Sequence, residues 1–143
     1  WLGLAPPQDI DGESLLPFLR DGDVTGWRDA VHWERDFRDV VGFVHERWFG
    51  LSPDQCAFAV IRDENYKYVH FSGLPAAFYD LREDPHQLVN RAGDPALRAR
   101  ELDYAQKMLS WRLIHADRTL TNMFATPGGM HEWRGSRTRP VGD

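Results

Sequence analysis

Two apolar runs separated by three polar residues stand in the middle of the chain and constrain its fold most strongly. Residues 57–62 (AFAVIR) and 66–71 (YKYVHF) are rich in β-branched and aromatic side chains. Between them, residues 63–65 (DEN) suit a tight reversal. The sequence therefore predicts a β-hairpin. A third short run at 78–81, stopped by Asp84-Pro85, extends the hairpin to a small antiparallel meander.

A further strand is predicted before this meander, over residues 28–34. The apolar Val31 and Trp33 alternate there with His32 and Glu34, which is the period-two pattern of a strand with one buried face. Residues 35–53 then mix charges with aromatic side chains over a length that is unusual for an unstructured connection, and such loops are often functional.

Three polar residues mark the point where this strand enters the long loop. His32, Glu34 and Asp36 are candidates for the rim of a pocket, although a solvated strand face is the simpler interpretation.

A long helix is predicted from Asp94-Pro95 to His115. Asp suits the N-cap and Pro suits the first helical position. Apolar residues then recur at three- and four-residue spacing, at Leu97, Leu102, Ala105, Met108, Leu109 and Leu113. We expect this stripe to pack on the sheet, with Leu102, Ala105 and Leu109 at the contact.

The predicted fold class is α+β: a four-stranded antiparallel sheet with one long amphipathic helix packed across it. A sheet this small leaves its second face open. Because aromatic residues make up 13% of the chain, we expect that face to be covered by something else.

Composition narrows the class of protein. The net charge of -5 and the scattered arginines argue against a nucleic-acid partner. No apolar run is long enough for a signal peptide or a membrane span, so no membrane partner is expected. Cys56 is the single cysteine, which excludes an internal disulfide and slightly favours a cytoplasmic location.

Residues with catalytic potential do not form a recognisable pattern. Cys56 is interpreted as a small core residue, since free cysteines are commonly buried and inert. The histidines show no H-E-x-x-H or H-x-H spacing, and His45-Glu46 and His131-Glu132 are isolated pairs. The sequence thus predicts no catalytic, cofactor-binding or metal-binding residue in this chain.

The central run resembles a known family. Residues 66–69 (YKYV), 78–81 (FYDL), Asp84-Pro85 and Asn90-x-Ala92 are similar to the C-terminal subdomain of sulfatases, which belong to the alkaline-phosphatase-like superfamily of hydrolases. The usual run reads L-Y-D-L-x-x-D-P-x-E-x-x-N-L-A. This chain carries Phe78, Gln87 and Arg91 at three of those positions. Residues 26–38 and 103–121 look most like the phosphonate monoester hydrolase branch, which is related to the arylsulfatases.

The resemblance implies a larger parent enzyme. Sulfatases use a formylglycine nucleophile, made from Cys or Ser in a C-x-P-x-R type motif, beside a divalent metal ion. Cys56 lacks the Pro and the Arg of that motif, so both groups are expected in a missing upstream catalytic domain. The parent is expected to hydrolyse sulfate, phosphate diester or phosphonate esters and to form a homo-oligomer. The alternative is a free-standing, non-catalytic binding or assembly module with the same fold.

The same resemblance suggests a division of the chain. Residues 1–20, with a short helical turn at 15–19, are expected to be the remnant of a domain junction, and 21–116 the subdomain itself. Residues 117–143 are expected to form an irregular arm. It carries Leu120, Met123, Phe124, Met130 and Trp133 but is too rich in Pro and Gly to build its own core, so these residues are candidates for subunit contacts; a disordered tail is the alternative.

Overall fold

The computed structural model describes residues 14–22, 26–39, 41–115 and 123–132. The chain divides into two units. One is Gly26–Ile114, and the other combines Trp1–Thr25 with His115–Asp143. Each unit is considered by itself.

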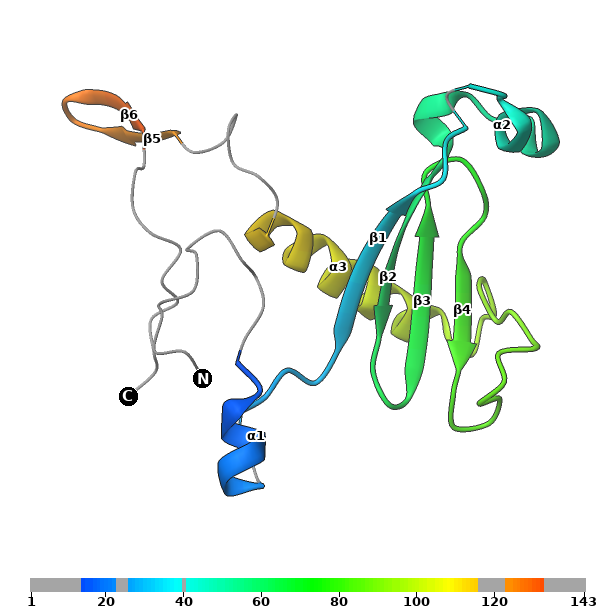
Figure 1. Cartoon of the computed structure of the whole chain (residues 1–143), viewed down its shortest axis with the longest axis horizontal. Coiled ribbons are helices and arrows are strands. Elements are labelled where there is room, and N and C mark those ends of the chain that lie inside the picture. Colours follow the sequence, from blue (N-terminus) through cyan, green and yellow to red (C-terminus); the bar gives the residue numbers. More distant parts are fainter. Residues whose placement is uncertain (1–13, 23–25, 40, 116–122, 133–143) are drawn as a thin grey trace. The chain divides into compact units, whose positions relative to one another are not determined.

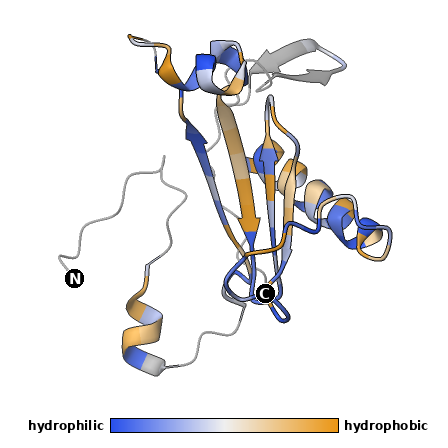
Figure 2. Ribbon diagram, turned by 90° about the vertical axis from the view of Figure 1, so that its right-hand side faces the viewer, coloured by the Kyte–Doolittle hydropathy of each residue, from blue (hydrophilic) through white to orange (hydrophobic). Residues whose placement is uncertain are grey.

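The first unit is built on one antiparallel sheet (Figure 1). Its strands are β1 (Val31–Asp36), β2 (Ala57–Arg62), β3 (Tyr66–Phe71) and β4 (Ala77–Asp80), and they pair in the order β1-β2-β3-β4. Helix α3 (Arg98–His115) lies across one face of this sheet, as Figures 1 and 2 both show. The α+β prediction is therefore confirmed.

The β2–β3 turn forms as the polar residues predict. Asp63 Oδ1 accepts hydrogen bonds from the backbone amides of Asn65 and Tyr66, both at 2.8 Å, and the Asp63 amide donates to the Tyr66 carbonyl at 3.0 Å. This side-chain turn fixes the register of the hairpin, because it leaves no freedom in the number of loop residues.

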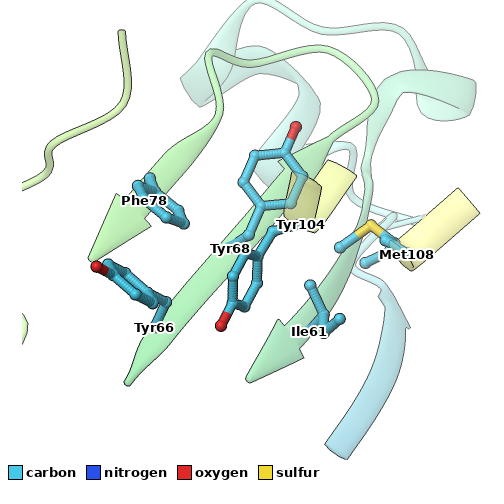
Figure 3. Close-up of a cluster of buried hydrophobic side chains, with 7 residues drawn as sticks. Ile61, Tyr66, Tyr68, Phe78, Tyr104 and Met108 are labelled. Carbon is cyan, nitrogen blue, oxygen red and sulfur yellow. The ribbon is translucent and has the colours of Figure 1, made fainter. Parts of the chain in front are cut away.

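The register sorts side chains into two faces. One cross-strand row contains His32, Ile61, Tyr68 and Phe78, and the next row contains Trp33, Val60, Val69 and Ala77. Neighbouring rows point to opposite faces of a sheet. The first row lies under α3, where residues from sheet and helix form the main core (Figure 3): Ala59, Ile61, Tyr66, Tyr68, Phe78, Tyr104 and Met108.

This register corrects the interpretation of the first strand. The alternation placed Val31 and Trp33 on a buried face, but they are 52% and 39% exposed, whereas His32 lies under α3, stacked on Trp111. Alternation reveals the period of a strand and not which face is covered. Helix α3 covers the face that carries His32, because that face also carries Tyr68 and Phe78, the larger side chains of β3 and β4.

The contact face of α3 also differs from the prediction. Tyr104 and Met108 are buried against the sheet, with Leu97 and Ala105 partly buried beside them. Leu102 and Leu109 are 58% and 60% exposed, and Leu113 is exposed as well. The helix therefore carries two apolar stripes, one buried and one exposed. At 3.6 residues per turn, the stripe of Leu102, Leu109 and Leu113 lies opposite the aromatic one. The predicted contact holds for Ala105 and is wrong for Leu102 and Leu109.

The start of α3 lies three residues later than predicted. Asp94 does act as a cap, since its Oδ1 accepts from the Ala96 amide at 2.9 Å, but residues 95–97 form a turn before the helix begins at Arg98.

The long connection between β1 and β2 contains regular structure that the sequence pattern did not indicate. It folds into helix α2 (Val44–Phe49) and a short 3-10 helix, η1 (Pro53–Gln55). In η1 the Ser52 and Gln55 side chains form a capping box.

The second unit contains helix α1 (Leu16–Asp21) and a two-stranded hairpin of β5 (Met123–Thr126) and β6 (Gly129–Glu132). Helix α1 confirms the predicted helical turn. The hairpin corrects the expectation of an irregular arm over these residues, because Pro127-Gly128 forms the turn between two paired strands rather than a break in structure. Leu120 and Trp133 lie outside the described residues.

The two stripes of α3 predict different costs for neighbouring substitutions. Met108→Ala should lower the free energy of unfolding by about 2–4 kcal/mol, because it leaves a cavity in the main core. Leu109→Ala, one position along, should change it by less than about 0.5 kcal/mol, since Leu109 is exposed. Urea unfolding followed by tryptophan fluorescence measures both, and equal losses would contradict the assigned helix face.

Candidate functional site

The residues that carry the family resemblance have structural roles in this fold. Asp80 is buried, and its carboxylate accepts from Arg82 Nε at 2.9 Å and from Arg82 Nη2 at 2.6 Å. Arg82 also donates to the Tyr66 hydroxyl and lies 4.7 Å from the centre of that ring. The hydrogen bonds from Arg82 hold the pKa of Asp80 below its ordinary value. Asp80 therefore ties the end of β4 to β3.

Two further side chains of this run close the loop after β4. Asp84 Oδ2 accepts from the Val89 amide at 2.8 Å. Asn90 Oδ1 accepts from the amides of Phe78 and Ala92, both at 2.9 Å, and its Nδ2 donates to the Ala76 carbonyl at 3.2 Å. The Asp-Pro and Asn of the family run thus satisfy backbone groups of an irregular segment.

The long loop is organised by two carboxylates. Asp39 accepts from the amides of Gly42 at 2.9 Å and Val44 at 3.3 Å, and these bonds lower its pKa. Glu46 is buried and accepts from the Asp39 amide at 3.0 Å through Oε1, while its Oε2 has no hydrogen-bond partner among the described residues. The loop also holds Phe43 at a φ of 51°, a left-handed conformation that is uncommon for an aromatic residue.

The three candidate rim residues each contact a different partner. His32 stacks on Trp111 with ring centres 4.6 Å apart, and Glu34 pairs with Arg112 at 2.6 Å. Asp36, at the far end of β1, pairs with Arg38 at 2.5 Å. The first two join the edge strand to α3. A role at a pocket rim stays a prediction for all three.

Cys56 is fully buried, and burial raises the pKa of its thiol, with smaller contributions from Glu46 and Asp36. A thiol held in the neutral form is a poor nucleophile. The assignment of Cys56 to the core is consistent with this environment.

The part of the chain that the structure describes contains no group of three or more His, Cys, Asp or Glu side chains arranged to hold a metal ion. Within the same ranges, no helix is both long enough and apolar enough to cross a bilayer.

The sheet face opposite α3 is the second face that was expected from the sequence to be open, although Lys67 on it was not singled out there. Lys67 lies there between two rings, with its Nζ 5.9 Å from the centre of Trp33 and 5.7 Å from that of Tyr79. Its Nζ donates to Gln87 Oε1 at 2.8 Å. Burial lowers the pKa of Lys67, and Arg62, directly opposite on β2, lowers it further. The strict alternation of Tyr66-Lys67-Tyr68 was the signal that Lys67 would face away from the aromatic core.

Two curated proteins are similar to most of this chain. No family model matches the chain. The multifunctional alkaline phosphatase superfamily protein PehA of Trinickia caryophylli is 55% identical over 130 residues, which are 91% of this chain and 25% of that protein. An ulvan-active sulfatase of Formosa agariphila is 24% identical over 150 residues, covering 85% of this chain and 28% of the relative.

Solved structures give the same result. The phosphonate monoester hydrolase of Agrobacterium radiobacter is 50% identical, with a TM-score of 0.71, over 87% of this chain and 25% of that one. The Silicibacter pomeroyi enzyme of the same name is 31% identical, also with a TM-score of 0.71, over 90% of this chain and 26% of that one. The chain therefore spans about a quarter of the length of the relatives it matches.

The Asp80–Arg82 pair predicts an acid-sensitive contribution to stability. Because the pKa of Asp80 is lower in the folded state, its contribution is present above the unfolded-state pKa of about 3.9 and is lost as the pH falls through the folded-state pKa. Asp80→Asn should cost about 1–3 kcal/mol at pH 7, typical of a hydrogen bond to a charged group, and less at pH 3.

Urea unfolding at both pH values measures this difference. Asp54→Asn is the control, because Asp54 is almost fully exposed and its nearest basic nitrogen, on Arg38, is 3.9 Å away. A loss for Asp80→Asn that is the same at pH 3 and pH 7 would contradict the charged pair.

Proposed function

Because this chain is a homologue of the phosphonate monoester hydrolases and sulfatases of the alkaline phosphatase superfamily, we propose that it is the C-terminal part of an ester hydrolase. The parent enzyme hydrolyses phosphonate monoesters, phosphate diesters or sulfate esters. The observation that carries the proposal is the identity of 55% with PehA and 50% with a solved phosphonate monoester hydrolase, each over most of this chain. The lower identity of 24% with the ulvan-active sulfatase favours the phosphonate branch.

The chemistry of the parent resides outside the described residues. In this proposal, a formylglycine nucleophile and a divalent metal ion are supplied by an upstream catalytic domain. One observation supports this division: Cys56 is buried and the pKa of its thiol is raised, which makes it a poor nucleophile. The bound metal would stabilise the negative charge of the ester in the transition state.

The role of this chain is structural. Its sheet and helix pack on the catalytic domain and shape the surroundings of the cleft, with His32, Glu34 and Asp36 as the candidates for a rim.

We also assign the C-terminal arm to subunit contacts within a homo-oligomer of the parent. Leu120, Met123, Phe124 and Trp133 are the candidates, on the apolar composition of that segment. Removing residues 117–143 should then lower the number of subunits in the parent assembly, as measured by its mass in solution. An unchanged number of subunits would exclude the arm from the assembly.

The activity is tested by comparing the parent with the isolated chain. The parent, supplied with Mn²⁺, should turn over an aryl phosphonate monoester, an aryl phosphodiester or an aryl sulfate, and replacing its formylglycine precursor by Ala should abolish this. The 143-residue chain alone should show no metal-dependent turnover.

Two results would contradict the proposal. One is a parent that is inactive on all three esters. The other is turnover by the isolated chain that survives purification and disappears in Cys56→Ser or His32→Ala, since it would place the chemistry in this chain.

A further inference from the structure

The sheet face opposite α3 is apolar but lacks a covering layer among the described elements of its unit (Figure 1). Val60, Val69 and Ala77 form a second buried cluster there, rimmed by partly buried Phe58, Phe71 and Tyr79. Val31 and Trp33 continue this surface to the edge strand, at 52% and 39% exposed. A two-layer fold normally buries the apolar faces of its sheet, so this face is suited to contact another body.

The apolar surface extends without a break onto the long loop. Phe71, Phe58, Phe37 and Phe49 form a chain of ring contacts, with centres 5.6 to 6.2 Å apart, and Trp48 lies 6.5 Å beyond Phe49. Trp48 and Val41 are 82% and 88% exposed. We refer to the sheet face and this loop together as the open face. Exposed apolar surfaces of this kind mark interaction sites.

The open face carries positive charge that the unit does not balance. Arg62 and Lys67 are directly opposite each other on neighbouring strands, and Arg35 points to the same face. None of the three forms an ion pair with a carboxylate of the described residues. Like charges in a direct cross-strand pair are destabilising, so a partner that brings carboxylates to this point would be favoured.

We propose that the open face binds the part of the parent enzyme that lies outside this chain, through an apolar surface with carboxylates opposite Arg62 and Lys67. The proposal rests on the proposed function only in requiring a parent. About three quarters of each relative's length lies beyond the segment this chain matches, so a large neighbouring body is available. A second copy of the chain fits less well, because a two-fold contact centred on this face would bring Arg62 and Lys67 of both copies together.

A charge reversal on the full-length parent tests the assignment. Arg62→Glu should place a carboxylate against those of the partner surface. We expect a lower unfolding temperature and at least a threefold faster proteolytic release of the region 26–114. Trp33→Ser should act in the same direction. The matched control is Arg98→Glu, an exposed charge reversal on α3, which should leave both readouts unchanged.

In the isolated chain, the same substitution should not lower the unfolding temperature. There the new carboxylate of Arg62→Glu faces Lys67 without the carboxylates of a second body beside it, so the substitution should leave the unfolding temperature unchanged or raise it. Neither readout uses turnover, so failure here is distinguishable from failure of the proposed activity.

Two results would overturn the proposal. One is a full-length Arg62→Glu and Trp33→Ser that behave like Arg98→Glu. The other is a change in the oligomeric mass of the full-length variants without a change in proteolytic release. That result would place a second copy on the open face.

Discussion

The structure depends most on the packing of three aromatic rings between the sheet and α3. Phe78 is fully buried, stacks on Tyr66 with centres 5.3 Å apart, and meets Tyr104 of the helix edge-on at 5.7 Å. Both tyrosines keep their hydroxyls hydrogen-bonded, Tyr66 to Arg82 and Tyr104 to Asp63. Burial and the contact with Asp63 raise the pKa of Tyr104, so it stays a neutral donor. One cluster therefore joins the β2–β3 turn, the end of β4 and the helix.

Sequence patterns predicted the elements better than their orientation. The strands β2–β4 and the existence of α3 follow from period and turn chemistry, which are local properties. The buried face of β1 and of α3 could not be predicted, because each element carries apolar residues on two sides: Trp33 opposes His32, and Leu109 opposes Tyr104. Which side is buried is decided by the element that packs on it, and not by the local sequence pattern. Helix α2 was missed because a carboxylate, Asp39, organises its start rather than an apolar period.

The presence of apolar residues on both faces of the sheet also bears on the proposed function. The residues that resemble the family run stabilise the unit from within, through hydrogen bonds of Asp80, Asp84 and Asn90. The open face carries Arg35, Arg62 and Lys67, which form no ion pair within the described residues. A unit with a packed core and one uncovered apolar surface fits the proposed role as the C-terminal part of a larger hydrolase.

The relative reactivity of the chain's two lysines tests most directly whether the open face is covered in the parent. Lys67 lies on the open face, and Lys107 lies on α3, paired with Asp103 at 3.2 Å. Acetylation with an N-hydroxysuccinimide ester, read by peptide mass spectrometry, would compare their rates in the full-length parent and in the 143-residue chain. If the open face is covered in the parent, the acetylation rate of Lys67 relative to that of Lys107 should fall at least tenfold there. An equal ratio in the two proteins would contradict this proposal, because the open face would then be exposed to solvent in the whole enzyme.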